Sequence, residues 1–127
     1  LGADTWGDGQ TFWQSIREQT HSFFQSHKPL WRLSINPAIA PLSVPGKQLL
    51  EWSGGLRWLV CDDPSDAESI RSVAKAAGGH ATLFRHGDEQ TPIFHPLSPG
   101  VMKIHRALKE KFDPQRIFNP GRLYPEL

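Results

Sequence analysis

Apolar positions recur along this chain with two spacings, one typical of helices and one typical of strands. Steps of three and four residues predict helices over residues 11–26, 64–77 and 99–112. In the last of these we expect four apolar side chains to face inward, namely Val101, Ile104, Leu108 and Phe112. Lys28 and Pro29 end the first helix, because proline disfavours the α conformation in the residue before it.

Two of the predicted helices begin with a capping residue followed by proline. Asp63 precedes Pro64, and Ser98 precedes Pro99. A side-chain oxygen at the N-cap accepts from a free N–H of the first turn, and proline suits the first helical position because no N–H is needed there. Residues 1–10 hold three glycines without periodicity and are interpreted as an irregular lead-in.

A two-residue alternation predicts four strands, over residues 30–35, 48–52, 56–61 and 80–85. Ser53, Gly54 and Gly55 join the second and third strands, which indicates a hairpin. Residues 36–46 contain three prolines, each of which lacks a backbone donor, so this segment is predicted to be an extended connector. Residues 86–97 are polar and predict a surface loop.

The order of these elements predicts a single α+β domain over residues 1–127. We expect a ferredoxin-like sandwich, in which helices cover one face of a mainly antiparallel sheet. A chain of 127 residues has room for one hydrophobic core, and an apolar content of 38% is compatible with a folded domain.

Charge and composition exclude several classes of function. Lys and Arg number 14 against 13 Asp and Glu, for a net charge of +1, so phosphate neutralisation is not expected to drive binding of nucleic acid. No apolar run approaches the length of a membrane-spanning helix. The single cysteine, Cys61, has no partner for an internal disulfide, and a reduced, cytoplasmic setting fits best.

The segment W-S-G-G-L-R-W, Trp52–Trp58, places two tryptophans around a glycine turn. In one interpretation the indoles are core or cross-strand packing. In the other, Arg57 offers its planar guanidinium to a substrate carboxylate. Arg32 and Arg85 have the same chemistry, and strand alternation does not say which of the three faces a site.

Histidines cluster near the fourth strand, at His80, His86 and His95. Their spacing fits no zinc pattern, so no metal site is expected. A histidine with a pKa of about 6.5 could instead take a proton from an alcohol, which makes His80 a candidate for substrate binding. The glycine pairs at 54–55 and 78–79 match no phosphate-binding loop.

Three motifs resemble one family of flavoproteins. The segment D-P-Q-R-I-F-N-P-G-R, Asp113–Arg122, resembles the closing motif of FAD-linked oxidases of the vanillyl-alcohol oxidase type. Together with W-S-G-G-L-R-W and with G-H-A-T-L-F-R at Gly79–Arg85, it resembles the C-terminal domain of the E subunits of bacterial glycolate oxidases. The resemblance extends from about residue 30 to residue 127.

The resemblance implies that this chain is a cap domain and that an N-terminal FAD-binding domain of the same polypeptide lies outside it. The start at Leu1, without an initiator Met, agrees with that expectation. Such a subunit takes part in oxidising glycolate, a small 2-hydroxy acid, to glyoxylate by hydride transfer to FAD. The implied partners are a sister flavin subunit and an iron–sulfur subunit, and any contact with the inner membrane would be made through them.

By the same resemblance, a turn in the closing motif would return the chain to the flavin. Its cofactor-binding residues would be Asn119, Pro120, Gly121 and Arg122. Arg57, His80 and Arg85 are the candidates for binding substrate. Alone, these 127 residues are expected to bind no FAD and to be inactive on glycolate.

One departure from the wider family leaves an alternative open. Related 2-hydroxy-acid dehydrogenases carry the ligand motif G-H-x-G-D-G-N-x-H, whereas His80 is followed here by Ala81, Thr82 and Leu83. Substrate could therefore be oxidised in the sister flavin subunit. The chain would then be a non-catalytic assembly module that docks the sister flavin and iron–sulfur subunits; an independent small-ligand domain is the third possibility.

Overall fold

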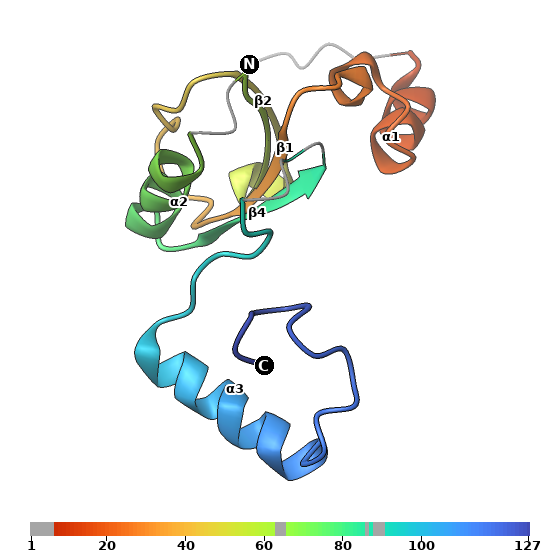
Figure 1. Ribbon diagram of the computed structural model, residues 1–127. Helices are drawn as coiled ribbons and strands as arrows, with labels where there is room; N and C mark the ends of the chain where they lie inside the picture. Colours follow the sequence, from red (N-terminus) through yellow and green to blue (C-terminus); the bar gives the residue numbers. More distant parts are fainter. Residues whose placement is uncertain (1–6, 63–65, 86, 88–90) are drawn as a thin grey trace.

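Figure 1 shows a computed structural model of the chain, which describes residues 7–62, 66–85, 87 and 91–127. Its α-helices are α1 (Gly9–Arg17), α2 (Ala67–Ala76) and α3 (Pro99–Phe112), and its short 3-10 helices are η1 (Ser22–Gln25) and η2 (Trp52–Gly54). The strands are β1 (Leu30–Ser34), β2 (Lys47–Glu51), β3 (Leu56–Val60) and β4 (His80–Arg85). The α+β class and the predicted order of α-helices and strands are confirmed.

The four strands form one antiparallel sheet in the order β2-β3-β1-β4. β1 lies between β3 and β4, so that Arg32 of β1 is opposite Trp58 on one side and Thr82 on the other. β2 and β3 pair as the predicted hairpin, with Leu49 opposite Trp58. Each strand lies within one residue of its predicted bounds.

The ferredoxin-like topology is not confirmed. That topology would place a helix between the first two strands, whereas residues 36–46 join β1 to β2 without one. Pro37, Pro41 and Pro45 remove three backbone donors from this segment, which disfavours a helix and accounts for the predicted connector.

Helical elements cover both faces of the sheet, so the prediction of helices on one face is wrong. α2 packs on one face, over a core that consists of Trp31, Leu33, Ile35, Leu59, Cys61, Ile70, Ala74, Ala77, Ala81 and Leu83. α1 and η1 cover part of the other face, over a second core that consists of Ile16, Phe24, Leu30, Trp58 and Val60. The physical reason is that β1 and β3 carry apolar side chains on both faces, and each set needs a cover.

The first helix is shorter than predicted, because the chain breaks after Arg17. Gln19 has a φ of 55°, a left-handed conformation that ends a helix. A separate turn, η1, follows, in which His21 Nδ1 accepts a hydrogen bond from Phe23 N at 3.2 Å and Phe24 enters the second core. Gly9 and Gln10, predicted as lead-in, form the first turn of α1, and residues 1–6 lie outside the described residues.

α2 ends where the glycine pair predicts. Gly78 has a φ of 73°, and a Cβ on Gly79 would lie 1.9 Å from the carbonyl oxygen of Ser34, so a side chain has no space there. Asp66 occupies the N-cap position; Asp63 and Pro64, the predicted start, lie outside the described residues.

α3 has the predicted bounds and cap, since Ser98 Oγ accepts from Val101 N at 3.4 Å. The predicted inward face is wrong: no α3 residue is buried, and the exposed fraction runs from 41% at Val101 to 79% at Phe112. Figure 1 shows α3 lying away from the sheet beyond residues 91–98, with the chain after it returning beside the helix. A periodic apolar stripe predicts that a face is covered but not what covers it, and no described element lies over this one.

No helix of the described residues has the length and apolar character to cross a membrane.

Candidate functional site

Arg57 is buried and its guanidinium holds the fold together. Its Nε donates to Gly54 O at 3.1 Å, its Nη2 to Ile39 O at 2.9 Å and its Nη1 to Ala40 O at 3.3 Å. These bonds tie the proline connector to the hairpin turn. A substrate carboxylate would have to displace them, so the geometry does not favour the contact with substrate that we predict for Arg57.

The two tryptophans that flank the hairpin turn have different environments. Trp58 is buried and makes edge-to-face contacts with Phe24 and Phe84, at centroid distances of 5.5 and 5.0 Å. Cross-strand packing is therefore confirmed for Trp58. Trp52 is 82% exposed, and it and Ser53 both have positive φ, of 52° and 53°.

Arg85, at the end of β4, is half-buried. Its Nη2 donates to Phe24 O at 3.3 Å, and its guanidinium carbon lies 5.9 Å from the centroid of the Phe84 ring. Its Nε is buried without a hydrogen-bond partner among the described residues. Arg85 is thus partly engaged with the second core, and its role in binding substrate stays a prediction.

His80 lies in a group of polar side chains on the open part of the sheet. Arg32 is opposite Thr82, and Ser34 is opposite His80. Their strand neighbours Leu33, Ala81 and Leu83 belong to the core under α2, so alternation places these four residues on the other face. We call Arg32, Ser34, His80 and Thr82 the open-face cluster. Arg32 is the one exposed residue of β1, and it makes no hydrogen bond or ion pair with any described residue.

His95 lies on the other side of β4 from β1 and packs against the edge of the sheet. Its Nδ1 accepts a hydrogen bond from Ala81 N at 3.3 Å. Burial lowers the pKa of His95, and the positive charges of Arg71, His80 and Lys75 lower it further. His86 lies outside the described residues, and nowhere in the described ranges do three His, Cys, Asp or Glu side chains gather as metal ligands.

A basic groove of about 810 Å³ separates α2 from residues 95–99. Arg71, Lys75 and His95 contribute to its lining, together with Glu68. The guanidinium of Arg71 lies over the Trp31 ring at 5.3 Å and donates to Pro92 O. Arg71 thereby anchors the segment that leads to α3, a role that the sequence pattern does not indicate.

The closing motif folds around a buried aspartate. Asp113 Oδ1 accepts from Ile117 N, and Asp113 Oδ2 from Phe118 N, both at 2.9 Å. Lys109 Nζ lies 2.6 Å from Asp113 Oδ2 and also donates to Phe118 O at 2.5 Å. The Lys109 ammonium and these N–H groups hold the pKa of Asp113 below its usual value. The segment after α3 is therefore a defined turn, fixed by Asp113.

This turn carries two further exposed apolar side chains beyond those of α3. Ile117 and Phe118 are 65% and 67% exposed although their backbone is held by Asp113. We define the α3 surface as the exposed apolar side chains of the helix and tail, namely Val101, Ile104, Leu108, Phe112, Ile117, Phe118 and Leu123. Tyr124 ties the tail back, since its hydroxyl donates to His95 O at 2.9 Å. The position of Asp113 before Pro114 is the one sequence signal that marks this residue. Its bonds to two backbone N–H groups become visible only in the folded structure.

Asn119, Pro120, Gly121 and Arg122 form an exposed turn between Phe118 and Leu123, two residues of the α3 surface. Asn119 and Gly121 have φ values of 46° and 70°, and Asn119 O accepts from Arg122 N at 3.3 Å. A Cβ on Gly121 would meet no atom within 4 Å, so among the described residues only the positive φ requires glycine there.

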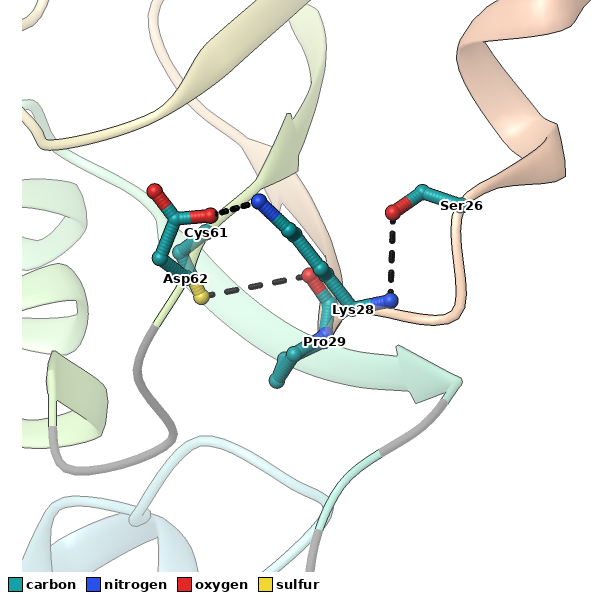
Figure 2. Close-up of polar contacts among 5 residues, drawn as sticks. All are labelled: Ser26, Lys28, Pro29, Cys61 and Asp62. Carbon is teal, nitrogen blue, oxygen red and sulfur yellow. Dashed lines mark hydrogen bonds and ion pairs between the residues drawn. The ribbon is translucent and has the colours of Figure 1, made fainter.

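A second polar site lies where β1 begins and β3 ends (Figure 2). Pro29 O accepts from both the backbone N and the Sγ of Cys61, and the Lys28 ammonium pairs with the Asp62 carboxylate. Burial raises the pKa of the Cys61 thiol. A protonated, fully buried thiol is a poor nucleophile, so Cys61 is not a catalytic candidate. Its contacts with Pro29 instead connect the start of β1 to the end of β3.

Comparison with known proteins shows which protein the chain is similar to. Over 117 residues the chain is 45% identical to "Glycolate oxidase subunit GlcE" of Escherichia coli (strain K12). The chain is homologous to part of a glycolate oxidase subunit. The match includes 91% of this chain and 32% of the relative, so the chain spans about a third of the relative's length. No protein-family model and no solved structure matches the chain significantly.

The resemblance drawn from the three motifs is thereby confirmed. It implies FAD, and the described residues fit that group only in part. Arg122 is a cation that suits a phosphate, and the turn that carries it is exposed; yet residues 119–122 line neither the groove beside α2 nor the neighbouring pocket that Tyr124 lines. These four residues alone therefore do not enclose a flavin.

Proposed function

We propose that this chain is the C-terminal domain of a glycolate oxidase FAD-linked subunit. It docks on an FAD-binding part of the same polypeptide and contributes to the oxidation of glycolate to glyoxylate. The observation that carries this proposal is the α3 surface: four large apolar side chains are exposed on α3 and three on the tail after it, and Asp113 fixes the turn that carries two of these, Ile117 and Phe118. Contiguous exposed apolar patches usually mark interfaces.

The chain contributes orientation and cover to the reaction. FAD, when bound, accepts the hydride that leaves the 2-hydroxy acid. The α3 surface would hold this domain against the cofactor-bearing part and exclude water from the contact, and residues 119–122 would lie at the edge of the flavin. A sister flavin subunit and an iron–sulfur subunit remain the proposed partners.

A second candidate function is non-catalytic assembly, and the hairpin tip favours it. The side chain of Trp52 is 82% exposed. Trp52 and the next residue, Ser53, are both in the left-handed conformation, which is uncommon for residues other than glycine. Such strained backbone is common at functional sites, and tryptophan is enriched among the residues that dominate binding energy at interfaces. In this alternative the tip docks a sister subunit and the substrate never meets this chain.

Reconstitution from two parts tests the proposal. The remainder of the subunit is produced separately, and its FAD content and glycolate-dependent reduction of a dye are measured with the sister subunits, with and without this chain. We expect the chain to raise both quantities. If it restores only the capture of sister subunits, with FAD content and turnover unchanged, the assembly function is correct; if it changes none of the three, both proposals are wrong.

A further inference from the structure

The open-face cluster contains, on a central strand, a cation that has no partner among the described residues. β1 is paired on both sides, by β3 and β4, so the backbone of Arg32 is fixed in place. The guanidinium is exposed, and no described acidic side chain pairs with it. A charged fork on a rigid strand is already organised for a ligand, because little backbone freedom remains to be lost on binding.

The other two candidate arginines are committed elsewhere. All three donor nitrogens of Arg57 reach backbone carbonyls, and Arg85 is bonded to Phe24 O beside the Phe84 ring. Among the three arginines that the sequence leaves equally eligible, Arg32 is the one whose donors all lack a partner among the described residues, whereas Arg85 keeps its Nη2 bonded and its Nε buried. The strand register therefore makes a distinction that the sequence does not.

The surroundings of Arg32 favour a small carboxylate. On one side, in the adjacent strand β3, lies the buried indole of Trp58. The indole Nε1 donates to Glu51 Oε2 at 2.6 Å, so the Glu51 carboxylate is already paired with Trp58. On the other side, Thr82 adds a hydroxyl directly opposite Arg32. A bidentate guanidinium contact beside an aromatic wall is stronger than one in open water, since the wall excludes solvent from one side.

We propose that Arg32 binds the carboxylate of the 2-hydroxy acid substrate, with the hydroxyl of Thr82 as a second donor. Ser34 and His80, two residues along the same strands, lie where the remainder of a small hydroxy acid would extend. This inference rests on the proposed function, and it implies that the open face of the sheet is turned toward the flavin when the domain is docked.

The test uses the complete subunit assembled with its partners. We compare Arg32→Met and Arg32→Lys with the wild type, and use Arg17→Met as the control, because Arg17 is an exposed arginine on α1 outside the cluster. Glycolate KM and kcat, FAD content, subunit composition and the Kd of oxalate by calorimetry are measured. Oxalate is an unreactive carboxylate probe, so its binding does not depend on turnover.

For Arg32→Met we expect KM for glycolate and Kd for oxalate to rise about 10- to 100-fold, with FAD content and assembly unchanged. Arg32→Lys should recover only part of the loss, because lysine lacks the planar fork, and Arg17→Met should match the wild type. Unchanged KM and Kd in Arg32→Met would overturn the inference, as would loss of assembly, which would make Arg32 an interface residue. A wild-type assembly that does not oxidise glycolate would instead overturn the proposed function.

Discussion

Asp113 and Lys109 form an ion pair across one turn at the end of α3, with Lys109 Nζ 2.6 Å from Asp113 Oδ2. The same carboxylate accepts from the backbone of Ile117 and Phe118 at 2.9 Å. One buried aspartate therefore sets the position of two of the exposed side chains in the α3 surface. Through these contacts the segment D-P-Q-R-I-F holds the backbone of Ile117 and Phe118 in a defined position.

Asp113→Asn should loosen this turn. The neutral amide loses the ion pair with Lys109, and its NH₂ group cannot accept from one of the two backbone N–H groups. We expect amide hydrogen exchange at Ile117 and Phe118 to become about tenfold faster, while exchange in β1 and β3 stays the same. Glu126→Gln, an exposed change in the same tail, is the control. Equal exchange at both amides in wild type and Asp113→Asn would contradict this role.

The turn should also have a defined dependence on acid. Because the folded pKa of Asp113 lies below its unfolded value, its stabilisation is fully present above about pH 4 and is lost as the pH falls through the lowered pKa. The carboxyl carbon shift of Asp113, followed by NMR between pH 2 and pH 6 (roughly the range of carboxyl titration), measures this directly. Titration at or above the ordinary aspartate pKa would mean that the contacts with Lys109, Ile117 and Phe118 do not hold in solution.

His95 should make the segment before α3 sensitive to mild acid. Its folded pKa is lowered by burial and by nearby positive charges, so the unfolded chain takes up the proton more readily. Stability should fall as the pH drops below about 6.5 and should be constant above it. Thermal unfolding at several pH values checks this, and His95→Gln should flatten the dependence. A stability that rises as the pH drops below about 6.5 would mean that the folded pKa of His95 is raised and not lowered.

Arg57 and Arg32 should differ sharply in their effects on stability. Arg57→Ala leaves three backbone carbonyls without their donor, and we expect the free energy of unfolding to fall by about 2–4 kcal/mol. Arg32→Ala, on an exposed position of β1, should change it by less than about 0.5 kcal/mol. Urea unfolding of the two variants measures both values. A similar loss of unfolding free energy in both variants would contradict the assignment of Arg57 as a structural residue and of Arg32 as one that is free to bind a ligand.

The elements that local sequence signals define were predictable. Gly78 and Gly79 end α2 because one has a positive φ and the other meets Ser34 O, and Ser98 caps α3 as its position before Pro99 indicates. The hairpin follows from the glycine turn between β2 and β3. In each case the determinant lies within a few residues of the element.

Features that depend on partners distant in sequence were not predictable. The role of Arg57 depends on carbonyls of residues 39 and 40, and the availability of Arg32 depends on the register of β1 with β3 and β4. The inward face expected for α3 is exposed, because the periodic pattern records that a face is apolar and carries no information about its cover. The break at Gln19 precedes η1, whose Phe24 packs against Trp58, a residue 34 positions further along the chain.

The central claim is that the α3 surface seats this domain on the cofactor-bearing part of the subunit. The most direct measurement is the FAD content of the purified complete subunit that carries Ile117→Ser and Phe118→Ser together, with Leu50→Ser as the control, because Leu50 is 54% exposed on β2 and lies outside the α3 surface. We predict that the double variant retains less than about a tenth of the wild-type FAD, as expected when hot-spot side chains are removed from an interface, and that Leu50→Ser retains all of it. Full FAD content in the double variant, with this domain still folded, would contradict the account.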